Sequence, residues 1–182
     1  MILEALPFEG LFKLTPEPQW DKRGFFARCF SRDSLAAAGL VTDLPEWSLS
    51  YNLRRGTLRG LHWQAAPYLE AKLVQCIRGA VFDVVVDMRH GSPTRGRWHA
   101  IVLSAENRHL LYVPKGFAHG YQTLADDSEL LYHISEPFRP ECARGVRWND
   151  PDLAVDWPLV EGLILSDRDS GLPLLAQVNE KL

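Results

Sequence analysis

Hydrophobic and polar positions alternate in short runs along this chain, and turn-forming residues separate the runs. The runs are rich in β-branched and aromatic side chains and recur at intervals of roughly 8–12 residues, a spacing typical of antiparallel sandwiches and barrels. Strand and helix patterns do not alternate, which argues against a doubly wound α/β fold. The predicted strands cover residues 25–30, 46–52, 57–64, 71–78, 80–88, 98–103, 109–113, 121–125 and 129–135.

Two helices are predicted outside the strand series. The first covers residues 31–39, where Ser31 is a suitable N-cap and Gly39 a suitable terminator. The second covers residues 172–182. The chain has no internal repeat, low-complexity tract or linker, so we expect one all-β domain over residues 1–182 with short helical additions near both termini.

The composition excludes several classes of protein. The chain has 182 residues, 46% of them hydrophobic, and a net charge of -3 with no cluster of Lys and Arg, so we expect no nucleic-acid partner. The longest apolar run, residues 79–88, contains two aspartates and is too short to span a membrane, so no membrane partner is expected. The first ten residues do not resemble a signal peptide, which predicts a cytoplasmic protein. The three cysteines, Cys29, Cys76 and Cys142, lack metal or redox spacing and are expected to be small buried hydrophobes.

Three segments carry candidate chemistry. In Arg59-Gly-Leu-His62 the two polar residues would face opposite sides of a regular strand, and a bulge at Gly60 could turn both into one cavity. Lys72 opens an apolar strand, so its ammonium group either reaches the rim or points into a site. In Pro114-x-Gly-x-x-His119 a tight turn delivers a histidine to the start of a strand, and this pattern resembles the second motif of the cupin superfamily.

A metal site is the alternative that this motif raises. Metal-binding cupins present a His-x-His pair, a glutamate and a final histidine. Here the corresponding residues are His62, Gln64, Glu70 and His119. Because a glutamine replaces one imidazole, we expect no metal, and a metal-dependent cupin is kept as the alternative.

The motifs, taken in order, are similar to those of the dTDP-4-dehydrorhamnose 3,5-epimerase family from about residue 7 to about residue 172. The resemblance implies a cupin-type antiparallel jelly-roll barrel and a homodimer. It also implies an epimerase without cofactor that inverts C3, C5 or both in a nucleotide-linked 4-keto-6-deoxyhexose. The motifs are Arg23-Gly-Phe-Phe26, Gly56-Thr-Leu-Arg-Gly-Leu-His62, Lys72-Leu-Val, Asp83-Val-Val-Val-Asp87, Ser92-Pro-Thr94, Pro114-x-Gly-Phe-Ala-His119-Gly, Tyr132, Trp148-Asn-Asp-Pro151, Trp157-Pro158 and Leu165-Ser-x-Arg-Asp169.

The same resemblance implies the catalytic roles. His62 would be the base and Asp169 its orienting partner, with Asp167 as the second choice. Lys72, helped by Arg59, would stabilise the enolate. Tyr132 would return the proton from the opposite face. Asp83 is expected to be a structural partner or a rim charge.

Substrate binding is implied at positions that match the family and at positions that depart from it. Matching positions are Arg23, Phe26, Arg59 and His119, together with Phe138, where the family has a stacking tyrosine. The departures are Arg28 for a glutamate, Trp47 and Leu49 for a Gln-x-Asn stretch, Arg168 for a lysine, and Ala143 for a glutamate that Glu141 could replace. Loss of polar partners changes discrimination, so C3-only epimerisation, ketoisomerisation and CDP- or GDP-linked substrates are alternatives.

Overall fold

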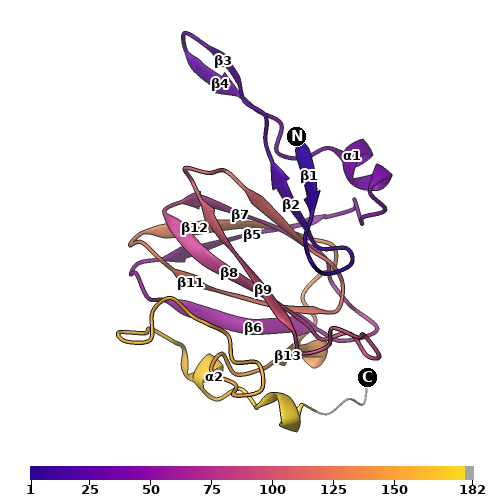
Figure 1. The fold of residues 1–182 in the computed structure, drawn as a ribbon, viewed down its shortest axis with the longest axis vertical. Coiled ribbons are helices and arrows are strands. Elements are labelled where there is room, and N and C mark those ends of the chain that lie inside the picture. Colours follow the sequence, from indigo (N-terminus) through magenta and orange to yellow (C-terminus); the bar gives the residue numbers. More distant parts are fainter. Residues whose placement is uncertain (179–182) are drawn as a thin grey trace.

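The computed structural model describes residues 1–178 as two facing antiparallel sheets and a separate hairpin (Figure 1). This arrangement confirms the predicted all-β class. The six-stranded sheet has the order β1 (Ile2–Ala5), β2 (Phe12–Thr15), β10 (Leu110–Val113), β7 (Lys72–Arg78), β12 (Ser128–Ile134) and β5 (Glu46–Asn52). The five-stranded sheet has the order β13 (Ala143–Gly145), β6 (Leu58–Gln64), β11 (Phe117–Thr123), β8 (Ala80–Asp87) and β9 (Trp98–Ser104).

The hairpin of β3 (Gln19–Asp21) and β4 (Gly24–Phe26) extends away from the two sheets (Figure 1). Only three residues pair on each side, so the strand predicted over residues 25–30 is shorter and begins earlier than expected. Its large apolar side chains are open to solvent: Trp20 is 67% exposed and Phe26 is 77% exposed.

The core explains why β8 reads as an almost continuous apolar run. Val81 and Val85 belong to the cluster that fills the space between the sheets, whereas Val84 and Val86 belong to a second cluster. That second cluster includes Leu153 and Trp157 of the C-terminal segment, which covers the outer face of the five-stranded sheet. Because both faces of this strand are buried, its odd-numbered and its even-numbered positions are both largely apolar.

Short helices complete the fold. The Ser31 side chain caps α1 (Arg32–Ala37), as predicted, and Leu35 is buried in a third cluster with residues of the six-stranded sheet. The helix predicted over residues 172–182 is wrong for residues 172–178, where only the 3₁₀ turn η2 (Leu175–Gln177) forms. Pro173 explains this, because it lacks an amide donor and keeps the preceding residue extended. Residues 179–182 lie outside the described part of the chain.

The remaining differences are a shifted boundary and elements that were not predicted. Strand β11 begins at Phe117, four residues before the predicted start at 121, directly after Gly116, which turns the chain with a φ of 83°. The helix α2 (Asp167–Ser170) and the 3₁₀ turn η1 (Pro140–Cys142) were not predicted. Within residues 1–178, no helix is long and apolar enough to cross a membrane.

Candidate active site

A cavity of about 360 Å³ opens between the two sheets and is closed on one side by α2. Strands of both sheets contribute to its wall. Its lining residues are Ser48, Ser50, Arg59, His62, Lys72, His119, Gly120, Tyr121, Tyr132, Ile134, Ser166, Arg168 and Asp169. Every residue predicted as catalytic therefore lies in one cavity.

The seam between β6 and β11 brings Arg59 and His62 to the same side. His119 pairs with His62 and Tyr121 pairs with Arg59, so β6 has one more residue than β11 between the two pairs. This irregularity is the predicted bulge, and it turns both side chains into the cavity. A Cβ atom on Gly60 would stand 2.6 Å from the Gly120 Cα, so glycine is required where the strands approach.

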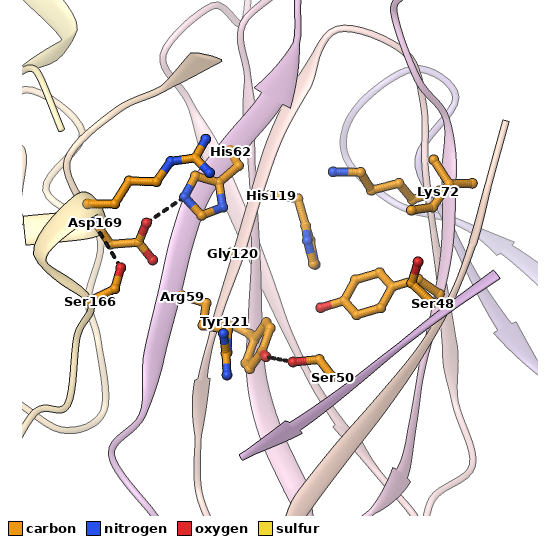
Figure 2. A pocket seen from close by; sticks show the side chains of 13 residues that line it. Ser48, Ser50, Arg59, His62, Lys72, His119, Gly120, Tyr121, Ser166 and Asp169 are labelled. Atoms are coloured by element: carbon orange, nitrogen blue, oxygen red, sulfur yellow. Dashed lines mark hydrogen bonds and ion pairs between the residues drawn. The ribbon is translucent and has the colours of Figure 1, made fainter. Parts of the chain in front are cut away.

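His62 and Asp169 form a hydrogen-bonded pair, with 2.7 Å between Nε2 and Oδ1 (Figure 2). The Ser166 hydroxyl caps α2 by accepting from the Asp169 amide, and the Gly60 amide donates to Asp169 Oδ2 at 3.2 Å. Burial raises the pKa of Asp169, but the hydrogen bonds from His62 and Gly60 outweigh it, and the pKa lies below its ordinary value. Because the contact engages Nε2, Nδ1 is the ring nitrogen available for proton transfer. Asp167 is exposed, so the partner is Asp169.

Tyr132 and Lys72 approach the cavity from the opposite sheet, on β12 and β7. Burial raises the pKa of Tyr132 well above its ordinary value, and the nearby Tyr121 and Asp83 add to the shift. The phenol is therefore neutral near pH 7 and can donate a proton. Lys72 Nζ lies 2.8 Å from a carboxylate oxygen of Glu70, which fixes the ammonium group at the cavity wall.

A second buried pair joins His119 to Asp83. Both carboxylate oxygens lie within 3.0 Å of His119 Nε2, and both side chains are buried. Burial raises the pKa of Asp83, and the neighbouring His119 and Lys72 oppose the shift. Asp83 was predicted as a structural partner or a rim charge. It is the partner of His119 in the cavity wall. The two residues are 36 positions apart, so the sequence alone does not reveal the pair.

The prediction for Trp47 and Leu49 needs correction. Their neighbours Ser48 and Ser50 line the cavity, whereas Trp47 and Leu49 lie on the other face of β5 and are 67% and 60% exposed. Successive side chains of a strand point to opposite faces. A match to the family's Gln-x-Asn stretch that is wrong by one residue therefore assigns the outward-facing residues of β5 to the cavity in place of the inward-facing ones. The Trp47 ring stacks edge-on against His133, with ring centroids 4.0 Å apart.

A second cavity of about 320 Å³ shares His62, Lys72 and Arg168 with the first and extends it to Phe138. Ala143 lines this extension, but Glu141, the proposed replacement, does not. The hairpin residues Arg23 and Phe26 and the adjacent Arg28 line neither cavity of this chain and are exposed. Arg23 and Phe26 belong to the hairpin of β3 and β4, which extends away from the two sheets, and Arg28 follows it (Figure 1).

The cupin metal-site residues are engaged in other contacts. The Gln64 amide donates to the carbonyls of Tyr68 and Pro137, and Glu70 pairs with Lys72. Within residues 1–178, no group of three or more His, Cys, Asp or Glu side chains is arranged to hold a metal ion. The fourth position, His119, is hydrogen-bonded to Asp83.

Comparisons with known proteins agree with this geometry. The family model described as dTDP-4-dehydrorhamnose 3,5-epimerase matches residues 5–177. A dTDP-4-dehydrorhamnose 3,5-epimerase of Sinorhizobium fredii is 40% identical, covering 98% of this chain and 91% of the relative. A dTDP-4-dehydrorhamnose 3-epimerase of Streptomyces niveus is 41% identical, covering 99% of this chain and 86% of the relative. The crystal structure of a dTDP-6-deoxy-D-glucose-3,5-epimerase from Legionella pneumophila in complex with dTDP-4-keto-L-rhamnose has a TM-score of 0.91 at 36% identity, covering 98% of this chain and 94% of that chain.

Proposed function

Because the chain belongs to the dTDP-4-dehydrorhamnose 3,5-epimerase family, we propose that it inverts C3 and C5 of a dTDP-linked 4-keto-6-deoxyhexose. The observation that carries this proposal is the placement of a base and an acid on opposite sheets. The His62–Asp169 pair lies on one side of the cavity and Tyr132 on the other. A substrate between them would lose a proton from one face of a carbon and gain one on the other.

The proposed reaction has two proton transfers at each carbon. His62 Nδ1 takes the proton next to the ketone, the C–H electron pair forms an enolate, and Asp169 stabilises the imidazolium. Lys72 and Arg59 offset the charge on the enolate oxygen. The Tyr132 hydroxyl then protonates the carbon from the opposite face, and solvent later restores both groups. The scheme uses neither a metal nor a nicotinamide.

The nucleotide is assigned to the extension of the cavity. Arg168 lines both parts and carries the charge that suits a diphosphate, and Phe138 offers an aromatic face to the base. His119 stays in the wall near the sugar, where Asp83 orients it. The exposed residues Arg23, Phe26 and Arg28 are assigned to the same binding step through a partner subunit.

The partner subunit is proposed to be a second copy in a homodimer. The outer face of β5 exposes Trp47 and Leu49, and the projecting hairpin exposes Trp20 and Phe26, so both surfaces leave apolar area uncovered. A symmetric pair would let each hairpin reach the other subunit's cavity. Light scattering should give the mass of a dimer, and a monomer mass would contradict this assembly.

Mixed dimers test the hairpin assignment. Arg23→Ala and His62→Ala should each lose activity as pure preparations. If Arg23 serves the partner's cavity, a mixed dimer has one cavity with both an intact His62 and an intact Arg23, and activity returns. If Arg23 serves its own subunit, no cavity of the mixture is intact and activity stays lost.

The main test follows protons at C3 and C5. The enzyme is incubated in deuterated water with dTDP-4-keto-6-deoxyglucose, and both carbons are observed by NMR. Incorporation at both supports the 3,5-epimerase, and His62→Ala should abolish it while remaining folded. Inversion at C3 alone is the second candidate, because a relative that is 41% identical is a 3-epimerase, and incorporation would then occur at C3 alone. No incorporation with this sugar would contradict the proposal, and the CDP- and GDP-linked ketosugars would then be tried.

The three cysteines are unpaired, which is usual in a reducing compartment, and we propose a cytoplasmic location. Cys76 and Cys142 are buried as expected, whereas Cys29 is half-buried.

A further inference from the structure

Gln64, at the last position of β6, is a buried polar residue that the proposed mechanism does not use. The residue is 2% exposed. Its amide nitrogen donates to the Tyr68 carbonyl at 3.1 Å and to the Pro137 carbonyl at 3.3 Å. Its amide oxygen accepts a hydrogen bond from the Arg139 backbone amide. The side chain therefore binds the main chain on both sides of Phe138.

The orientation of the Gln64 amide follows from its partners. A backbone amide can only donate, so the Arg139 N–H requires the side-chain oxygen, and the two carbonyls require the NH₂ group. Glutamine has two N–H donors, and the two carbonyls use both of them. Gln64 lines the extension of the cavity, but it keeps no N–H for a ligand there. We therefore expect it to act on a ligand through the loop that it holds.

Phe138 lies in that loop, between the end of β12 and the start of η1. It lines the extension of the cavity and is 64% exposed. A ring on an unsupported loop must be ordered by the ligand itself, which reduces affinity. The Gln64 hydrogen bonds order the loop in advance. The Arg139 guanidinium, 4.8 Å from the centre of the Tyr68 ring, joins the same two segments.

We propose that Gln64 is a positioning residue for nucleotide binding, which holds Phe138 in place for stacking on the base. This inference rests on the proposed assignment of the nucleotide to the extension of the cavity. Gln64 and His62 are two positions apart on β6, so their side chains lie on the same face of the strand. One strand thus carries the proposed base at the sugar and supports the aromatic ring at the nucleotide. The two ends of the substrate are kept at a fixed separation.

The test measures the affinities for dTDP and for inorganic pyrophosphate by calorimetry, because pyrophosphate has no base to stack. Phe138→Ala should weaken dTDP binding about tenfold, the value of one stacked base. Gln64→Met, which has a similar length but no amide, should weaken dTDP binding about fivefold, since the ligand must then order the loop. Pyrophosphate binding should be nearly unchanged in Gln64→Met. The double variant should bind dTDP about as weakly as Phe138→Ala alone, because both changes remove the same contact.

Gln122→Met is the matched control. Gln122 is also a buried glutamine, and its amide group donates to the Leu159 carbonyl and accepts from the Leu159 amide, each at 2.9 Å. Neither residue lines the cavity or its extension. The control removes the same kind of support from a different loop, so it should keep the wild-type affinity for both ligands.

Three results would overturn the inference. They are a wild-type affinity for dTDP in Gln64→Met, an equal loss of dTDP and pyrophosphate binding in that variant, and independent effects of the two changes in the double variant. If Gln64→Met does not fold, Gln64→Glu, which keeps the acceptor for the Arg139 amide, replaces it in the comparison with Phe138→Ala. A wild-type protein that binds no dTDP would contradict the proposed nucleotide assignment itself, and this inference with it.

Discussion

Replacement of Asp169 by asparagine changes which nitrogen of His62 carries the proton. In the native chain Asp169 Oδ1 accepts from His62 Nε2, and Oδ2 accepts from the Gly60 amide. In Asp169→Asn the carbonyl oxygen can still accept from Gly60, which directs the amide NH₂ at Nε2. Nε2 must then accept, so the proton moves to Nδ1, the nitrogen that faces the substrate. The proposed base is blocked by its own hydrogen.

The size of the loss follows from the contact that is removed. A hydrogen bond to a charged group contributes about 1.5–3 kcal/mol, which corresponds to about 10- to 150-fold in rate. Asp169 makes this bond with the imidazolium that forms during proton removal, and the wrong tautomer adds to the loss. We therefore expect proton exchange at C3 and C5 to fall by at least about tenfold.

The assay is the rate of deuterium incorporation by NMR, and Asp167→Asn is the matched control. Asp167 belongs to the same helix and is exposed, so its replacement changes the charge equally but leaves His62 unaffected. It should retain the wild-type rate. A folded Asp169→Asn enzyme with the wild-type exchange rate would refute the assignment of the dyad.

Three further predictions concern other parts of the molecule. Ser48→Ala should raise KM for the nucleotide sugar about fivefold in steady-state kinetics, because the cavity wall loses one hydroxyl group that can bind the substrate. The ultraviolet difference spectra of wild type and Tyr132→Phe should show no phenolate from Tyr132 below pH 10, since its pKa lies well above 10.0. The pKa of Asp87 is lowered from 3.8 to about 2 because the hydrogen bonds from Arg89, Ser92 and Thr94 outweigh the effect of burial. Its folded-state contribution, about 2 kcal/mol, is therefore complete above pH 4 and lost as the pH falls through 2. Urea unfolding of Asp87→Asn should show that deficit at pH 7 and a smaller one at pH 3.

The sequence predicts the central strands well and the peripheral ones poorly. Strands β5, β7, β8 and β9 lie within a residue or two of the expected ranges, because alternating or continuous apolar runs bounded by turns are strong signals. The strands β1, β2 and β13 were not predicted, since each has only three or four residues and gains its stability from pairing with distant strands.

The candidate site also has a part that was predicted correctly and a part that was not. His62 and Asp169 are 107 residues apart, so only the family resemblance placed them together, and the structure agrees. The face of β5 could not be read from its alternation. Apolar residues of a strand usually face the interior, yet here the serines face the cavity and Trp47 faces outward. The usual pattern is inverted because the interior at this point is a polar cavity.

The close approach of Gly60 and Gly120 divides the pocket into a part that tolerates no side-chain change and a part that protein engineering can vary. A side chain at either glycine would meet backbone atoms at 2.6 Å, so substitution there would separate β6 from β11. Libraries that seek new sugar specificity should leave this seam intact. They should vary Ser48, Phe138 and Arg168 instead, which line the cavity or its extension and do not belong to β6 or β11.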